Sequence, residues 1–169
     1  LVDFLCACPE LASIADRLAG FRAAMLAVGV ATPDAHVHVT RRDEPQAGMA
    51  LAAELLATGG LPKAMMCSSL MMLEGALAAI VERLGRLPDD LVVGTFDHHP
   101  LLDALPIRIV SVRQDERGIA EAAFACLAAE MAGAPRIAAR HVVAGRLVER
   151  GGSQPRRAAF SAANSSAEA

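Results

Sequence analysis

Short apolar segments alternate with longer amphipathic segments along most of the chain, and this order limits the possible folds more than any other feature of the sequence. Strands are expected at residues 2–7, 37–40, 63–67, 91–96 and 107–112, with a final strand or pair of strands within 138–148. Helices are expected from Ser13 or Asp16 to residue 28 and at 48–56, 68–84 and 118–131. Alternation at this spacing predicts an α/β fold with a parallel sheet covered by helices on both faces.

Composition supports a folded chain and gives no sign that this segment binds nucleic acid. Of the 169 residues, 54% are hydrophobic, which is enough for one domain with a packed core. The formal net charge of −3 gives no general attraction to phosphate backbones. No basic leader is present, and no apolar run reaches the length of about 18 residues that a membrane span needs. We therefore expect neither a signal peptide nor a membrane segment.

Polar side chains come after several of the expected strands, at the positions where a parallel sheet binds its ligands. Arg17 lies about one turn into the first helix, and Arg41 comes after the second strand. Ser68 and Ser69 come after the third strand and open a helix, and Asp97 comes after the fourth. Hydroxyl groups and a carboxylate suit a polyol, whereas arginines and a helix N-terminus suit a phosphate or carboxylate. The residues predict a small, oxygen-rich and anionic ligand.

Two histidine-containing segments raise the question of a metal site. Residues 97–99 read Asp-His-His after a strand, as in manganese phosphoesterases, but the chain contains no D-x-D segment to complete a two-metal site. His36 and His38 would share one face of a strand, without an evident third ligand. Loop and sheet-edge roles are therefore favoured over metal binding. The chain also lacks the glycine-rich phosphate and dinucleotide motifs, so we expect no cofactor.

An ordered set of segments resembles the effector-binding core of LacI/GalR-family transcriptional regulators. The set comprises Arg17–Met25, Ser68–Ala76, Leu87–Asp97, Ile109–Gln114 and Arg146–Gly151. Each segment alone is a weak signal, but their order and spacing together are specific. Within the family, the resemblance is strongest to the regulators that respond to phosphorylated fructose. It implies a bacterial repressor or regulator of transcription, located in the cytoplasm, and not an enzyme.

The family architecture implies a division of the chain. Residues 1–114 would form the second effector-binding subdomain, a truncated C-terminal subdomain of the periplasmic-binding-protein-like type I fold. Residues 115–135 would form a crossover helix that belongs to a first subdomain missing here, and residues 136–151 would return as strands. Residues 152–169 are expected to be disordered. A DNA-binding headpiece would precede Leu1, so operator DNA would be bound only through that missing part.

The resemblance also implies roles for individual residues. The family's effector arginine falls on Arg17 and its strand-end aspartate on Asp97, whereas its usual Asn-Asp pair falls on Ser69 and Leu70. Loss of that carboxylate favours an anionic ligand, because a carboxylate would repel a phosphate. The implied effector is a phosphorylated sugar such as fructose 1-phosphate or fructose 1,6-bisphosphate, and Arg41 could add a phosphate contact. The effector would act allosterically on a homodimer.

Two other functions remain open from the residues alone. One is a manganese phosphoesterase of the Asp-His-His type, in which His98 would be essential. The other is a periplasmic sugar-binding protein of the same fold, which an upstream signal peptide would favour and an upstream helix-turn-helix would exclude.

Overall fold

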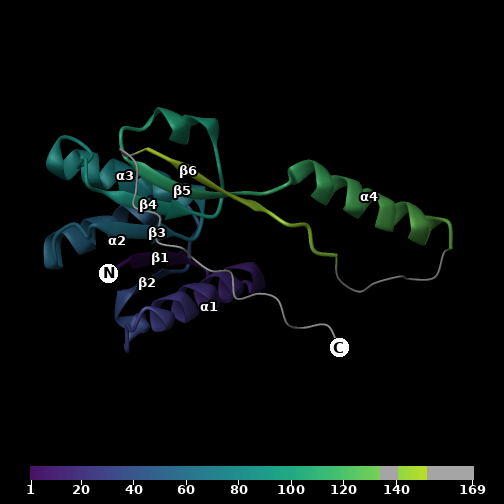
Figure 1. The fold of residues 1–169 in the computed structure, drawn as a ribbon, viewed down its shortest axis with the longest axis horizontal. Helices are drawn as coiled ribbons and strands as arrows, with labels where there is room; N and C mark the ends of the chain where they lie inside the picture. Colours follow the sequence, from purple (N-terminus) through teal and green to yellow (C-terminus); the bar gives the residue numbers. More distant parts are fainter. Residues whose placement is uncertain (134–140, 152–169) are drawn as a thin grey trace.

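The computed structural model describes residues 1–133 and 141–151, which form a six-stranded sheet with helices packed on it (Figure 1). The strands are β1 (Asp3–Ala7), β2 (Val37–Thr40), β3 (Ala64–Cys67), β4 (Val92–Thr95), β5 (Arg108–Arg113) and β6 (Arg146–Arg150). The helices are α1 (Ala12–Ala27), α2 (Pro45–Thr58), α3 (Leu70–Leu84) and α4 (Glu116–Met131), with short 3-10 helices η1 (Pro33–His36) and η2 (Pro100–Ala104).

The strand order is β2-β1-β3-β4-β5-β6, and the pairs from β2 to β5 are all parallel. Only β6 is antiparallel, paired with β5. The predicted α/β class and the largely parallel sheet are thus confirmed. Because parallel strands end at the same edge, the residues after β1, β2, β3, β4 and β5 share one rim of the sheet.

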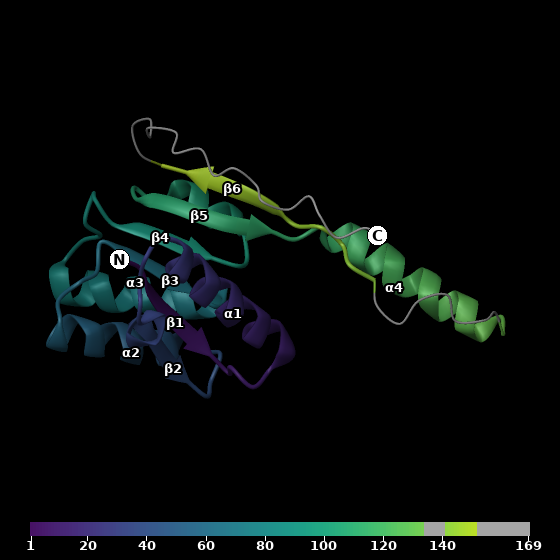
Figure 2. The same cartoon turned by 60° about the horizontal axis from the view of Figure 1, so that its bottom comes forward.

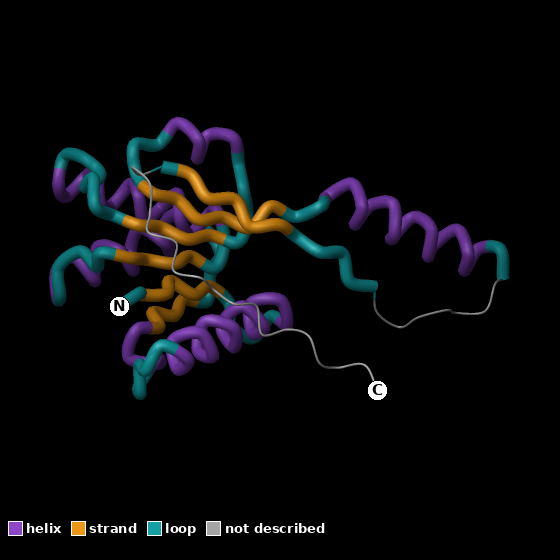
Figure 3. Tube along the Cα trace, viewed as in Figure 1, coloured by secondary structure: helices purple, strands orange, loops and turns teal. Residues whose placement is uncertain are grey.

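Helices cover the sheet unequally on its two faces (Figures 2 and 3). The larger apolar cluster joins β1, β3, β4 and β5 to α2 and α3, with Leu73, Ile80 and Ile109 among its buried side chains. The smaller cluster joins α1 to β1 through Phe4 and Phe21, whose ring centroids lie 5.0 Å apart. This cluster includes no residue of β5 or β6. The predicted covering of both faces by helices therefore holds for the part of the sheet around β1 and not for β5 and β6.

Two glycines allow α2 and α3 to pack closely together. A Cβ atom on Gly75 would overlap the carbonyl oxygen of Pro45, and a Cβ on Gly48 would overlap the carbonyl oxygen of Met72. Only hydrogen in place of a side chain permits this backbone approach. The contact holds the two helices as one layer on the sheet and fixes the N-terminus of α3 at the rim.

The ends of the helices show where local sequence signals were sufficient. The Ser69 hydroxyl caps α3 by accepting from the Met72 N–H at 3.2 Å, and Gly85 ends the helix in the left-handed conformation. The expected start of α1 at Ser13 or Asp16 is wrong, because the helix begins at Ala12 after Leu11, with no side-chain cap.

The C-terminal part departs most from the expected pattern. The strand expected within 138–148 is β6, which begins only at Arg146 and extends to Arg150. Residues 134–140 and the expected disordered tail, 152–169, lie outside the described residues. Helix α4 has no buried residue and projects away from the sheet beyond the ends of β5 and β6 (Figures 1 and 2).

Candidate functional site

Four of the predicted site residues lie in the loops after strands at the carboxyl rim, and the fifth, Arg17, lies on the adjacent helix α1. Arg41 comes directly after β2, Ser68 comes directly after β3, and Asp97 lies just beyond β4. The structure groups these residues into smaller sets, each with its own hydrogen bonds. The rim therefore consists of neighbouring clusters and not of one continuous network.

Arg17 is the best-anchored cation on the rim. Its Nη1 donates to the Ser68 carbonyl oxygen at 2.5 Å, and its guanidinium carbon lies 4.7 Å from the centre of the Phe96 ring. The carbonyl and the aromatic face both hold a cation in place without neutralising it with a carboxylate. The side chain thus joins α1 to the ends of β3 and β4 and retains its positive charge for a ligand.

Ser68 and Ser69 have structural partners. Ser68 is fully buried, and its hydroxyl oxygen accepts from the Ala7 N–H at 2.9 Å, which ties β1 to the end of β3. The Ser69 hydroxyl donates to Asp43 while it caps α3. The carboxylate expected to be lost at position 70 is absent, and the Asp43 carboxylate lies beside the same helix N-terminus.

Asp97 is held in place by a residue from the next strand. Its Oδ1 accepts from Gln114 Nε2 at 2.8 Å, which links the loop after β4 to the residue after β5. The Asp97 side chain is only partly buried, so its second carboxylate oxygen can accept a hydrogen bond from a ligand hydroxyl.

The side chains of the Asp-His-His segment diverge. Asp97 bonds to Gln114, His98 Nδ1 lies 2.9 Å from Ser111 Oγ, and His99 Nδ1 accepts from the Leu101 N–H at 3.2 Å. Across residues 1–133 and 141–151, no group of three or more metal-binding side chains could hold a metal ion. His38 bonds to Asp3 at 2.9 Å on the edge strand β2, which confirms its predicted sheet-edge role.

His98 is placed where its imidazole is poorly solvated. Its Nε2 is buried without a hydrogen-bond partner among the described residues. Burial lowers the pKa of His98, and the charge of Arg113 lowers it further. The neutral imidazole is therefore favoured in the folded chain.

Arg41 and Cys8 form the far end of the rim. The Cys8 thiol donates to the Arg41 carbonyl oxygen at 3.2 Å, and Cys8 adopts a φ of 47°, which is unusual for a residue other than glycine. The Arg41 side chain is exposed. Its guanidinium can thus turn toward a ligand but is not held in position as Arg17 is.

The sequence reasoning missed three residues that organise the rim: Phe96, Asp43 and Gln114. Each contacts a predicted site residue from a different loop. Gln114 could have been found, because it comes after a strand of the same sheet, as Asp97 does. No local signal identifies Phe96 or Asp43, since their roles depend on which loops the sheet brings together.

A parallel sheet with an anchored cation, a carboxylate and a capped helix N-terminus along its carboxyl rim defines one lobe of a periplasmic-binding-protein-like ligand-binding domain. The family described as "Periplasmic binding protein-like domain" matches residues 3–153. The chain belongs to this family, and it matches the effector-binding core of LacI-family transcriptional regulators.

Named relatives support this assignment. The catabolite repressor/activator of Escherichia coli (strain K12) is 32% identical over 120 residues, which are 71% of this chain and 35% of the relative. The Salmonella typhimurium protein of the same name is 36% identical over 78 residues, 46% of this chain and 23% of the relative. The chain thus spans about a third or less of the length of these relatives.

Solved structures show the same fold. The Cra transcriptional dual regulator from Pseudomonas putida, in complex with fructose 1-phosphate, matches with a TM-score of 0.75 and 25% identity, covering 88% of this chain and 54% of that one. The transcription regulator CcpA of Lactococcus lactis also has a TM-score of 0.75, at 18% identity, covering 90% and 55%. No described helix is both long and apolar enough to cross a membrane.

Proposed function

We propose that this chain is the ligand-sensing part of a bacterial, DNA-binding transcriptional regulator that responds to a sugar phosphate such as fructose 1-phosphate. The observation that carries the proposal is the guanidinium of Arg17, which the Ser68 carbonyl and the Phe96 ring hold at the rim, with no carboxylate paired to it among residues 1–133 and 141–151. A cation held in this way suits a phosphate oxygen. The structural relative from Pseudomonas putida, crystallised with fructose 1-phosphate, supports the same class of ligand.

The rim residues take different parts in this proposal. Arg17 binds a phosphate or sugar oxygen, Asp97 accepts from a sugar hydroxyl, and the exposed Arg41 adds a second cationic contact. Ser68 and Ser69 act mainly by position: the Ser68 carbonyl aims Arg17, and Ser69 fixes the start of α3. None of these roles requires a bond in the ligand to break, so the site serves recognition.

Regulation would result from binding between two lobes. Residues 1–114 supply one lobe, and residues 115–135 cross to the other, where α4 would find the apolar surface that it lacks here. A ligand that contacts both lobes favours one relative orientation, and only its different affinity for the two orientations can change the affinity for DNA. In the cytoplasm, a homodimer with DNA-binding headpieces preceding Leu1 would read a two-fold symmetric operator.

Calorimetry on the complete gene product that contains this chain tests the proposal. Fructose 1-phosphate should bind, and Arg17→Ala should weaken binding by at least about 1 kcal/mol, or fivefold, because a charged hydrogen bond is lost. Arg22→Ala is the matched control: Arg22 is on the same helix but pairs with Asp34 at 2.6 Å, away from the rim. Equal affinity in the Arg17 variant would remove Arg17 from the site. Manganese-dependent phosphatase activity abolished by His98→Ala would replace the proposal with an enzyme.

A further inference from the structure

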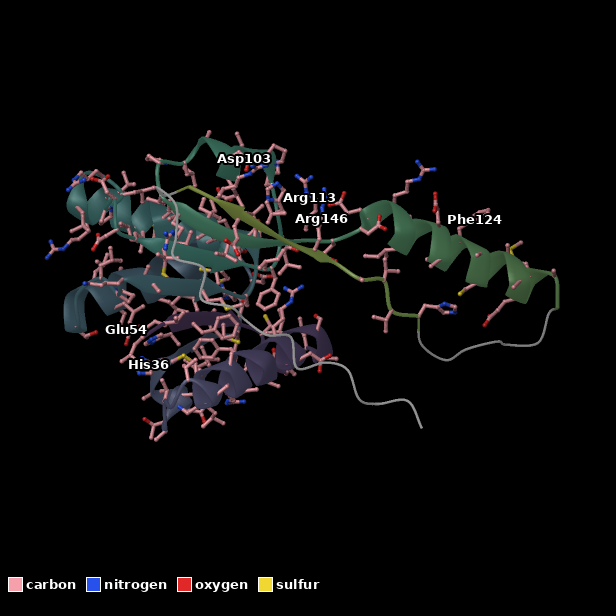
Figure 4. The ribbon with its side chains drawn as sticks, viewed as in Figure 1. His36, Glu54, Asp103, Arg113, Phe124 and Arg146 are labelled. Carbon is pink, nitrogen blue, oxygen red and sulfur yellow. The ribbon has the colours of Figure 1, made fainter. Side chains whose placement is uncertain are left out.

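Two arginines face each other at the end of the sheet nearest α4. Arg113 of β5 and Arg146 of β6 are direct partners in the antiparallel ladder, and Figure 4 shows them at the place where the strands leave the sheet. Opposed residues in such a ladder have Cα atoms about 4.5–5.5 Å apart, with side chains on one face. Like charges directly opposite each other destabilise a sheet. This pair therefore needs a compensating negative charge.

The described residues do not supply that charge through an ion pair. Neither Arg113 nor Arg146 has a carboxylate within 4.0 Å in residues 1–133 and 141–151. The contrast with Arg150, on the same face of β6, is direct: its Nε donates to Asp103 Oδ1 at 3.0 Å. On this face of the sheet, a carboxylate of the described residues therefore neutralises Arg150 but neither Arg113 nor Arg146.

A pocket opens beside the two arginines. Its volume is ≈ 310 Å³, and it is lined by Arg113, Gln114, Asp115, Ala144 and Arg146. Asp115 is the carboxylate among these lining residues, and its Oδ1 accepts from the Gly118 N–H at 3.0 Å as the cap of α4. Two guanidinium groups against one engaged carboxylate leave the pocket positive.

The backbone around the pair is closely packed. A Cβ atom on Gly145 would lie 3.2 Å from the carbonyl oxygen of Arg113, so β6 begins with its backbone close to the end of β5. The positive end of the α4 dipole points toward the same pocket, because Asp115 both lines the pocket and caps the helix. The helix dipole adds to the attraction for an anion.

We propose that Arg113 and Arg146 together bind the phosphate group of a small solute in this pocket. Two guanidinium forks can each donate two hydrogen bonds to one phosphate, and the bound charge removes the repulsion between them. Gln114 connects the pocket to the rim, since its carboxamide bonds to Asp97 at 2.8 Å. The phosphate would come from free inorganic phosphate or from the phosphorylated end of a sugar.

Thermal unfolding of the complete chain in inorganic phosphate, against sodium chloride of equal ionic strength, tests this site. At ten times its Kd, phosphate should raise the midpoint of unfolding by about 4 °C for a chain of this size. Arg113→Gln and Arg146→Gln should each abolish most of that rise, whereas Arg113→Lys should keep part of it. Arg86→Gln, which removes one exposed arginine elsewhere, should keep all of it. Without phosphate, Arg146→Gln should unfold at a higher temperature than the original chain, because the repulsion is gone.

Several results would overturn the site. These are a midpoint that phosphate does not raise, a rise that persists in a double Arg113→Gln, Arg146→Gln variant, and an equal loss in Arg86→Gln. Fructose 1-phosphate in the Arg17→Ala variant then identifies the source of the phosphate, with fructose as the control without a phosphate. A rise larger than that with inorganic phosphate, and lost in Arg146→Gln, indicates the sugar phosphate, whereas an equal rise indicates inorganic phosphate. A phosphate response without any binding of fructose 1-phosphate would reject the proposed effector while leaving this site intact.

Discussion

Helices α3 and α4 have nearly the same length and very different surroundings. The 15 residues of α3 bury Met72, Leu73, Gly75, Ala76, Ala79 and Ile80. The 16 residues of α4 bury none, and its Phe124, Leu127 and Met131 side chains are 72%, 59% and 82% exposed. An amphipathic pattern therefore predicts a helix, but only a partner surface makes that helix part of a core.

The two helices differ in the direction that the chain takes as it leaves the preceding strand. After β3, the chain turns back at Ser69 and α3 packs on the sheet and on α2. After β5, the chain continues outward past Gln114, and a crevice of ≈ 550 Å³ is lined by one face of α4 and by residues 141–143. This outward course is consistent with our proposal that α4 belongs to another lobe.

Truncating one apolar side chain on each helix should give the largest contrast. Ile80→Ala should lower the free energy of unfolding by about 4 kcal/mol, because it leaves a cavity at a fully buried position. Leu127→Ala should change it by less than about 0.5 kcal/mol, because the side chain is mostly exposed. Urea unfolding measures both. A large loss in the Leu127 variant would show that α4 packs on the body of the chain, and the comparison would fail.

Filling the close contact between α2 and α3 should have the next largest effect. Gly75→Ala should cost about 3 kcal/mol, since the new methyl group meets the Pro45 backbone and not a flexible side chain. Gly20→Ala on α1 is the matched control, because a Cβ there has open space and alanine favours a helix by up to about 1 kcal/mol. Thermal unfolding of the two variants should therefore shift in opposite directions. An unchanged unfolding temperature in the Gly75→Ala variant would mean that α2 and α3 can move apart with little loss of stability.

The body of the fold could be predicted from the sequence because each of its elements carries a local signal. Apolar runs gave β1 to β5 within one or two residues, and Ser69 and Gly85 gave both ends of α3. The rim positions of Arg17 and Asp97 could be inferred from strand order alone. Their partners Phe96 and Gln114 could not, because hydrogen bonds and ring contacts between loops depend on spacing across the sheet that no local pattern records.

The exposed apolar face of α4 should make the isolated chain self-associate. We expect the free energy involved to be smaller than the stability lost in the Ile80 or Gly75 variant. Phe124→Gln together with Leu127→Gln should reduce self-association in gel filtration at high protein concentration, because exposed apolar patches promote contact between copies. The free energy of unfolding should stay within about 0.5 kcal/mol of the original value. The matched substitution Val81→Gln, at a 44% exposed position of α3, should leave association unchanged. Equal association of all variants would assign the effect to another surface.

The smallest contrast concerns two histidines, His98 in the body and the exposed His141 beside α4. Burial, together with the smaller effect of the Arg113 charge, lowers the pKa of His98 in the folded chain below its ordinary value of 6.5, whereas Asp103 opposes this shift. The unfolded chain then binds a proton more readily than the folded chain, so the contribution of His98 to stability is present above pH 6.5 and is lost as the pH falls through and below that value.

Urea unfolding between about pH 7 and pH 5 tests this sign. His98→Asn should flatten the loss of stability on acidification, because asparagine does not titrate and its amide can still bond to Ser111. His141→Asn, which replaces an exposed histidine near α4, is the matched control and should leave the slope of the original chain unchanged. An unchanged slope in the His98 variant would contradict this expectation. It would mean that water reaches the His98 imidazole in the folded chain, so that the region between β4, β5 and η2 is as accessible to solvent as the surroundings of α4.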